Sequence, residues 1–219
     1  MTVLEQCVLR GITELLHFTT NRGVVGTLYT KALMSRRRLP EEKYLSHVLA
    51  LNSPRRREEQ ADFDKSEDWL DYVNLSVSEI NASFLGFSRR WHQDLWWAIL
   101  SFDSIIASHD GVYFATTNNS YDRCVRTSGD EGFSALFGPL VQRKSSPAWW
   151  VRRLERADRL TTCQQAEILY PGAVPLQYLK KIYVSEEQHY YSVYSMLRTA
   201  DVQGVEVVVD ALKFNGEPN

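Results

Sequence analysis

Residues 164–169 read Gln-Gln-Ala-Glu-Ile-Leu, a stretch that places a glutamate two residues after a glutamine and ends in apolar side chains. We interpret residues 165–169 as a β-strand, because a short run with β-branched and apolar residues after polar ones is typical of strands. Side chains two positions apart on a strand point to the same face. The pattern therefore predicts that Gln165 and Glu167 lie on one side of the same strand.

Other segments with strand character are spread along the whole chain. They are short and rich in β-branched or aromatic residues, and they cover residues 13–19, 72–77, 112–116, 179–184 and 205–212. Segments with helical character lie between them, at residues 22–33, 41–51, 91–100, 149–160 and 186–197. The order has no steady strand–helix alternation, so it predicts an α+β fold with a split, mostly antiparallel sheet and flanking helices.

Length and composition indicate one ordinary globular domain. The chain has 219 residues, of which 44% are hydrophobic and 24% charged, close to the averages for soluble proteins. Its longest apolar run, residues 95–100, is far shorter than the roughly 20 residues that a membrane helix needs. Residues 1–10 lack the apolar stretch of a secretory signal. We therefore expect a single domain over residues 1–219, in the cytoplasm and without a membrane partner.

The cysteines and histidines do not form a metal-site or disulfide pattern. The three cysteines are far apart in the sequence, at positions 7, 124 and 163, and the five histidines show no H-x-x-x-H spacing. We expect no metal, and we expect the cysteines to be small buried hydrophobic residues.

Positive charge is concentrated in a few segments, although the net charge is only −2. Arginines occupy positions 36–38 and 55–57, and residues 143–159 contain six basic side chains and two acidic ones. The acidic residues gather at positions 58–71 instead. Such segregation can build a basic groove for a polyanion, although solvated helix faces would give the same composition. Residues 53–71 are polar and predict a long loop of the kind that often binds ligands.

Several common catalytic motifs are missing from the sequence. It contains no G-x-x-x-x-G-K-[ST] phosphate loop, no G-x-G-x-x-G fingerprint after a strand and no G-x-S-x-G turn. Asp103, Asp110 and Asp122 could serve a metal-dependent nuclease, but their spacing does not require that role.

Four features in order resemble a known family. The first is His17-Phe18-Thr19, ahead of a predicted helix that begins near residue 21, and the second is the arginine run at 55–57. The third is the pair of segments 71–76 (DYVNLS) and 111–119 (GVYFATTNN). The fourth is the segment 164–169. Over residues 11–184 the chain resembles the DarT-type ADP-ribosyltransferase toxins, which attach ADP-ribose from NAD to bases of single-stranded DNA. Residues 73–77 (VNLSV) depart from the thymidine-modifying branch, so the chain looks closer to the guanine-modifying branch.

The resemblance implies an ADP-ribosyltransferase fold with NAD as co-substrate in a cleft between two sheets. It also implies no metal, a toxin–antitoxin pair, and an antitoxin of the macrodomain or a related glycohydrolase type that reverses the modification. The candidate site residues fall into three groups; His17, Thr19, Gln165, Glu167 and one arginine of the run 55–57 match positions of the family, and the match does not fix which arginine is catalytic. The catalytic candidates are Glu167, Arg55 and Arg56; the cofactor-binding candidates are His17, Phe18, Thr19, Arg57 and Tyr72; and the substrate-binding candidates are Gln165, Trp149 and Arg152.

Physical chemistry supports these residue types. Loss of nicotinamide leaves positive charge on the ribose, which a preorganised carboxylate stabilises, and an arginine can bind the pyrophosphate with two hydrogen bonds. An acceptor base must leave its stack, and aromatic side chains with nearby arginines can hold it.

Other readings of the same residues remain open. Glu167 could be an exposed residue on an edge strand, His17 a core histidine, and the tryptophans part of the core. The protein could also be a metal-dependent nuclease toxin, a silent nucleic-acid-binding module, or a transferase acting on RNA or on thymidine in DNA.

Overall fold

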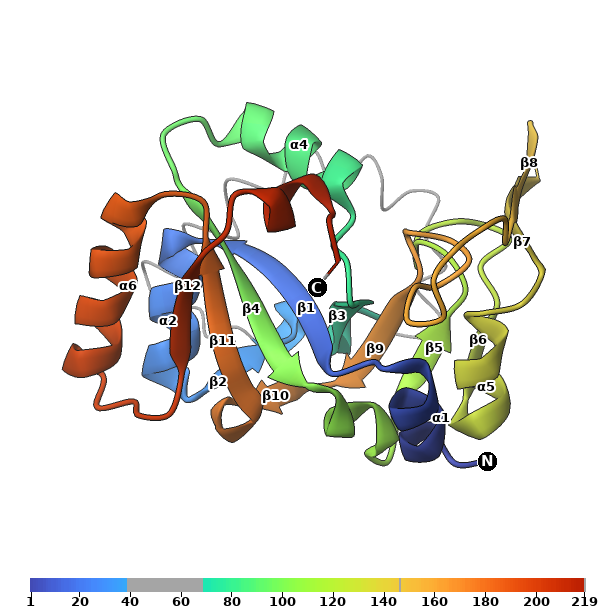
Figure 1. Ribbon diagram of the computed structural model, residues 1–219, viewed down its shortest axis with the longest axis horizontal. Coiled ribbons are helices and arrows are strands. Elements are labelled where there is room, and N and C mark those ends of the chain that lie inside the picture. The colour runs from blue at the N-terminus through green and yellow to red at the C-terminus, as the bar shows by residue number, and fades with distance from the viewer. Residues whose placement is uncertain (39–68, 146, 219) are drawn as a thin grey trace.

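The fold is built around one large twisted sheet (Figure 1). A computed structural model describes residues 1–38, 69–145 and 147–218. Within these residues the sheet has eight strands in the order β12-β11-β4-β1-β3-β9-β5-β6. Every neighbouring pair described in it is antiparallel except β11 with β12. The predicted α+β class with a mostly antiparallel sheet is confirmed.

The strands predicted from β-branched and aromatic runs all form. They are β1 (Glu14–Thr20), β3 (Tyr72–Val77), β5 (Tyr113–Ala115), β9 (Glu167–Pro171), β11 (Leu179–Val184) and β12 (Glu206–Val209). One boundary matters for the site, because β9 begins at Glu167 and Gln165 lies in the turn before it. The prediction that Gln165 and Glu167 share a strand face is therefore wrong, since strand alternation does not extend to Gln165.

The predicted helix at residues 91–100 is also wrong. Helix α4 (Ala82–Trp91) ends where that prediction begins, and the following apolar residues form β4 (Trp97–Asp103). This strand lies between β1 and β11, and its first six residues are buried. A strand covered on both faces is apolar throughout, so its sequence has no alternation that distinguishes it from a buried helix.

The predicted helix at residues 149–160 is replaced by a hairpin and a loop. Strand β7 (Leu140–Ser145) pairs with β8 (Ala148–Arg152), and the chain then runs irregularly to β9. The hairpin projects from the body of the protein (Figure 1). Two further short strands, β2 (Ala32–Met34) and β10 (Ala173–Pro175), pair with each other, and β6 spans Arg126–Ser128.

Two of the predicted helices form, with shifted ends, and cover one face of the sheet. They are α2 (Asn21–Thr30) and α6 (Glu187–Thr199). Val24 and Leu28 of α2 and Val193 and Leu197 of α6 are buried in the main core with Leu100 of β4. Helices α1 (Val3–Arg10) and α5 (Gly129–Ala135) lie near the other end of the sheet (Figure 1). The predicted helix at 41–51 lies outside the described residues.

The opposite face of β1 carries a buried ion pair. Lys213, in the short helix η7 (Leu212–Asn215), places its Nζ 2.5 Å from Oε1 of Glu14, and both residues are buried. The other carboxylate oxygen accepts hydrogen bonds from Ser101 (2.7 Å) and Tyr183 (3.0 Å). A buried pair needs such additional partners to offset its desolvation. The cluster ties the C-terminal segment to three central strands.

Within the described residues, no helix is long and apolar enough to span a membrane.

Candidate active site

The sheet separates between β1 and β3. Strand β1 pairs with β4 along its whole length, from Glu14 to Thr20, whereas it pairs with β3 only at Leu15 and Leu16. Beyond Leu16 the strands diverge, and the ring of His17 spans the gap, with Nδ1 2.9 Å from the carbonyl oxygen of Asn74. Because a carbonyl oxygen only accepts, His17 carries a proton on Nδ1. His17 is therefore not an ordinary residue of the sheet core but lies at the opening between its two halves.

The other residues of the first motif have different surroundings. Phe18 alternates to the opposite side of β1 from His17 and packs against Phe84 and Trp97, with ring centroids 5.7 and 5.9 Å apart. Thr19 lies against the first turn of α2. A Cβ added to Gly23 would come within 1.9 Å of Oγ1 of Thr19, so only glycine allows this close approach of helix and strand.

Glu167 opens β9 and is half-buried. Its Oε2 accepts a 2.7 Å hydrogen bond from the backbone N–H of Asn119, in the turn that follows β5. The guanidinium of Arg126 holds that turn, donating from Nε to Oδ1 of Asn119 (2.5 Å) and from Nη2 to its carbonyl oxygen. A carboxylate held by a charge-assisted bond to a braced backbone is a preorganised negative group.

Gln165 is held by the hairpin. Its Oε1 accepts a hydrogen bond from Nη2 of Arg143, on β7, and the same nitrogen lies 3.3 Å from the hydroxyl of Tyr121. The Arg143 guanidinium stacks over the ring of Trp149 at 4.2 Å and lies 5.4 Å from the ring centroid of Tyr121. Gln165 and Trp149 are thus connected through Arg143, and Glu167 lies two residues further along the chain than Gln165.

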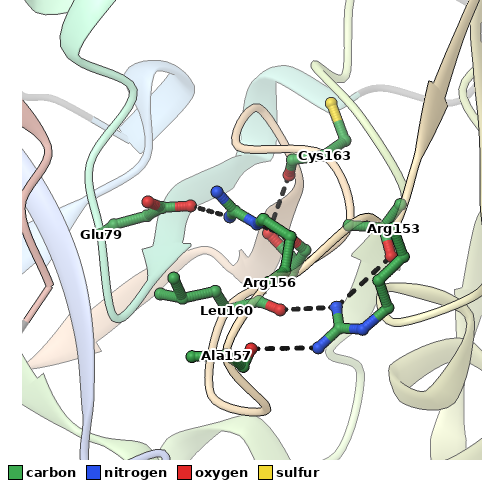
Figure 2. Close-up of polar contacts among 8 residues, drawn as sticks. Glu79, Arg153, Arg156, Ala157, Leu160 and Cys163 are labelled. Atoms are coloured by element: carbon green, nitrogen blue, oxygen red, sulfur yellow. Dashed lines mark hydrogen bonds and ion pairs between the residues drawn. The ribbon is translucent and has the colours of Figure 1, made fainter.

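Two arginines of the expected basic groove point inward instead. Figure 2 shows Arg153 donating to the carbonyl oxygens of Leu160 (2.7 Å) and Ala157 (3.0 Å). Arg156 donates from Nε to the carbonyl of Thr161 (3.0 Å) and forms an ion pair with the buried Glu79 (Figure 2). These contacts fold the loop before Gln165 and Glu167 against the body of the protein. Their function is to shape that loop, so the basic cluster at 143–159 presents fewer cations than its composition indicates.

Burial acts against the charge of Glu79. It raises the pKa of this carboxyl group above its ordinary value, and the hydrogen bond from Arg156 opposes the rise.

Arg152 and Tyr72 have surroundings different from those of Glu167. Arg152 is exposed at the base of β8 and, by alternation, shares a face with Trp150 and not with Trp149. Tyr72 pairs with Pro171, four residues along β9 from Glu167, which is roughly 13 Å along a strand. Its ring packs in an aromatic group with Trp69 and Tyr113. Arg55, Arg56 and Arg57 lie outside the described residues.

Sequence reasoning missed the residues that hold the Glu167 carboxylate and the side-chain amide of Gln165. Asn119 falls inside the stretch 111–119 singled out above, but it contributes its backbone, which no residue pattern marks. Arg126, Tyr121 and Arg143 act through contacts that only the packed hairpin and turn create.

The aspartates considered for a nuclease lie in separate surroundings. Asp103 ends β4 and accepts from the backbone N–H of Ile105, and Asp122 accepts from Ser145 of the hairpin. In the part of the chain that the structure describes, no group of three or more His, Cys, Asp or Glu side chains could hold a metal ion.

One protein family matches the sequence of this chain. The sequence profile described as "ssDNA thymidine ADP-ribosyltransferase, DarT" matches residues 16–214. Comparison with curated proteins gave no match.

Two solved structures of relatives have a similar fold. DarT of Thermus sp. 2.9 in complex with ADP-ribosylated ssDNA gives a TM-score of 0.64 at 12% identity, covering 93% of this chain and 96% of that one. DarTG of Thermosipho africanus in complex with ADP-ribose gives 0.61 at 14% identity, covering 94% of this chain and 52% of that one. The architecture is the DarT ADP-ribosyltransferase fold, as the sequence resemblance implied.

Proposed function

The chain belongs to the DarT family of NAD-dependent ADP-ribosyltransferases, and on that premise we propose that it transfers ADP-ribose to a base of single-stranded DNA at the site around Glu167. The observation that carries this proposal is the arrangement of Glu167: a half-buried carboxylate, fixed by the Asn119 amide, on the strand that the family resemblance assigns to catalysis. We also propose that residues 1–219 act as one transferase domain.

Glu167 would act on the charge that develops during transfer. The glycosidic bond between nicotinamide and C1 of the ribose breaks, and neutral nicotinamide leaves with the bonding electron pair. A nitrogen of the acceptor base then forms the new bond to C1 and releases its proton to solvent. Positive charge on the ribose is greatest between these events, and a fixed carboxylate beside it lowers the barrier without reorganisation.

His17 and Thr19 are the proposed NAD-binding residues. His17 lies where β1 and β3 diverge, in the motif that the family resemblance assigns to the nicotinamide-side ribose and amide. Phe18 packs against Phe84 and Trp97 and so fixes the backbone of this segment. On the family resemblance alone, we assign the catalytic arginine to one of Arg55, Arg56 and Arg57 and a cofactor contact to the same run.

The β7–β8 hairpin fits the DNA side. Trp149 and Trp150 are about half exposed, at 51% and 50%, which is unusual for such large apolar side chains. Trp149 lies on the face of the hairpin that contacts Arg143 and, through it, Gln165. An exposed aromatic ring beside cations is the combination that holds single-stranded bases and phosphates.

Guanine is the proposed acceptor base. The support is the departure of residues 73–77 from the thymidine-branch pattern, combined with their position. Leu75 pairs with Ile168, so the half-buried Asn74 and Ser76 alternate onto the face that Glu167 occupies. A change of side chains there alters the surface beside the reacting carboxylate.

We further propose that the protein is a cytoplasmic toxin whose cognate antitoxin, of the macrodomain or a related glycohydrolase type, removes the ADP-ribose.

The test is transfer from radiolabelled NAD to oligonucleotides. Single-stranded DNA, duplex DNA, RNA and the protein itself are offered in parallel, and the product is fragmented by mass spectrometry to locate the modified base. We expect labelling of single-stranded DNA at guanine. Efficient labelling of a guanine-free strand containing thymine would overturn the base assignment, and labelling of protein or RNA alone would overturn the DNA assignment.

A further inference from the structure

Arg143 lies at an irregularity of the β7–β8 hairpin. Gln142 pairs with Trp150 and Lys144 with Trp149, so the register shifts at Arg143, which has no directly opposite residue on β8. A bulge of this kind turns a side chain out of the regular alternation of its strand. Here it directs the guanidinium toward Gln165, in the turn before β9.

The guanidinium is confined in this position. Trp149 lies under it at 4.2 Å and Tyr121 beside it at 5.4 Å, and the Tyr121 hydroxyl is 3.3 Å from Nη2. Stacking on aromatic rings, together with contacts from Nη2 to Gln165 and Tyr121, restricts an arginine more than solvent does. Arg143 is therefore a fixed donor rather than a mobile surface cation.

A fixed donor determines which way the Gln165 amide points. An arginine has five N–H donors and no acceptor, whereas a glutamine amide has an acceptor oxygen on one side and two N–H donors on the other. Only Oε1 can face Arg143, as the structure has it. The side of the amide turned away from the guanidinium is consequently the Nε2 donor side.

We propose that Arg143 sets the base preference of the enzyme by fixing the amide of Gln165 with its N–H donors toward the acceptor base. This inference rests on the proposed function and on Gln165 as the group that meets the base. An N–H donor suits the carbonyl oxygens that guanine and thymine present at positions 6 and 4, and it opposes the amino groups that adenine and cytosine present there. Arg143 is thus a positioning residue that selects keto bases through Gln165.

The test replaces Arg143, which donates a hydrogen bond to Gln165, with a residue that accepts one. In Arg143→Glu the carboxylate accepts from Nε2 and turns Oε1 toward the base, so the labelling ratio of keto-base to amino-base oligonucleotides should fall at least tenfold, about the effect of one good base contact. Arg143→Gln can pair with either side of the amide and should give an intermediate ratio. Arg143→Lys keeps a donor-only partner and should retain the keto preference even where the total rate drops.

Lys144 provides the matched control. It is the next residue on β7, and its Nζ lies 4.7 Å from the ring centroid of Tyr121, whereas Arg143 is the residue that donates to Gln165. Lys144→Glu makes the same change of charge and should leave the base ratio unchanged. The labelling ratio of keto-base to amino-base oligonucleotides is measured with one preparation of each variant. A smaller folded fraction lowers both rates equally and leaves this ratio unchanged.

The two proposals fail in different ways. If the wild-type protein labels no DNA, the proposed function is wrong. If it labels DNA and the Arg143→Glu, Arg143→Gln and wild-type ratios are equal, or if Lys144→Glu changes the ratio as much as Arg143→Glu, the role of Arg143 is wrong and the proposed function stands.

Discussion

The carboxylate of Glu167 is held by the backbone of Asn119, a residue 48 positions earlier in the chain, through a hydrogen bond of 2.7 Å. Backbone groups move less than side chains, and this one is itself braced by Arg126. The negative charge is therefore placed before any ligand binds, which is what makes an electrostatic group effective in a transition state.

Glu167→Gln should reduce transfer at least 100- to 1000-fold, the typical loss for a preorganised electrostatic partner. The variant keeps the shape and one acceptor oxygen, so NAD binding should change little, because the charge acts mainly in the transition state. Transfer is measured with labelled NAD, and binding by calorimetry. Near wild-type transfer by a folded Glu167→Gln protein would exclude Glu167 as the catalytic carboxylate.

Arg126→Met should lower kcat on the order of 100-fold, since it releases the turn that carries Asn119 and a displacement of about 1 Å is enough for such a loss. The KM for NAD should change much less. Arg123→Met is the control, because Arg123 is exposed and its contact with Asp122 is 4.0 Å long. Equal kinetic effects of the two substitutions would show that the brace has no role.

Arg156→Met should destabilise the protein by about 3–5 kcal/mol, because it leaves Glu79 buried without its cation. Replacing both partners, as Glu79→Leu with Arg156→Met, should recover part of that loss, since no charge then stays buried. Urea denaturation of the wild type, both single variants and the double variant gives the coupling energy. Additive effects would mean that the pair contributes nothing as a pair.

Trp149→Ala should weaken the interaction with single-stranded DNA by about 1–3 kcal/mol, the usual contribution of one stacked base. Trp150→Ala is the matched control, because Trp150 is equally exposed on the opposite face of β8. Binding is followed by fluorescence anisotropy of a labelled oligonucleotide. A larger effect of Trp150→Ala would place the DNA on the other face of the hairpin.

Cys7 and Cys124 should resist alkylation in the folded protein. Burial raises the pKa of both thiols from 9.0 to about 11, so at pH 8 only about one molecule in a thousand carries either thiolate. Iodoacetamide at pH 8 should modify both residues only after unfolding, as peptide mapping can measure.

The same shifts predict a loss of stability in alkali. The unfolded chain releases these protons near pH 9 and the folded protein near pH 11, so the stabilisation is complete below pH 9 and is lost as pH rises to 11. The double variant Cys7→Ala with Cys124→Ala should lose less stability than the wild type over this interval. Parallel stability curves for the two proteins would contradict the assignment.

The sequence by itself determined the elements whose patterns are local. The β-branched and aromatic runs predict β1, β3, β5, β9, β11 and β12, and the ordered motifs His17-Phe18-Thr19 and Gln165-Ala166-Glu167 indicate the family. The sequence pattern gave the wrong element at β4, because a strand buried on both faces has no alternation of apolar and polar residues. It also gave the wrong element at residues 149–160, where arginines that point inward have the spacing of a polar helix face.

Only the tertiary structure decided how the site is assembled. Strand alternation does not set the positions of Gln165 and Glu167, because Gln165 precedes the strand. Each side chain is held by a group distant in the sequence: Gln165 by Arg143, and Glu167 by the backbone amide of Asn119. The position of Arg143 depends on a bulge, and that of Asn119 on a braced turn. Hydrogen bonds between groups far apart in the sequence leave no periodic pattern in it, and a backbone amide is common to every residue except proline, so these contacts became visible only once the chain was folded.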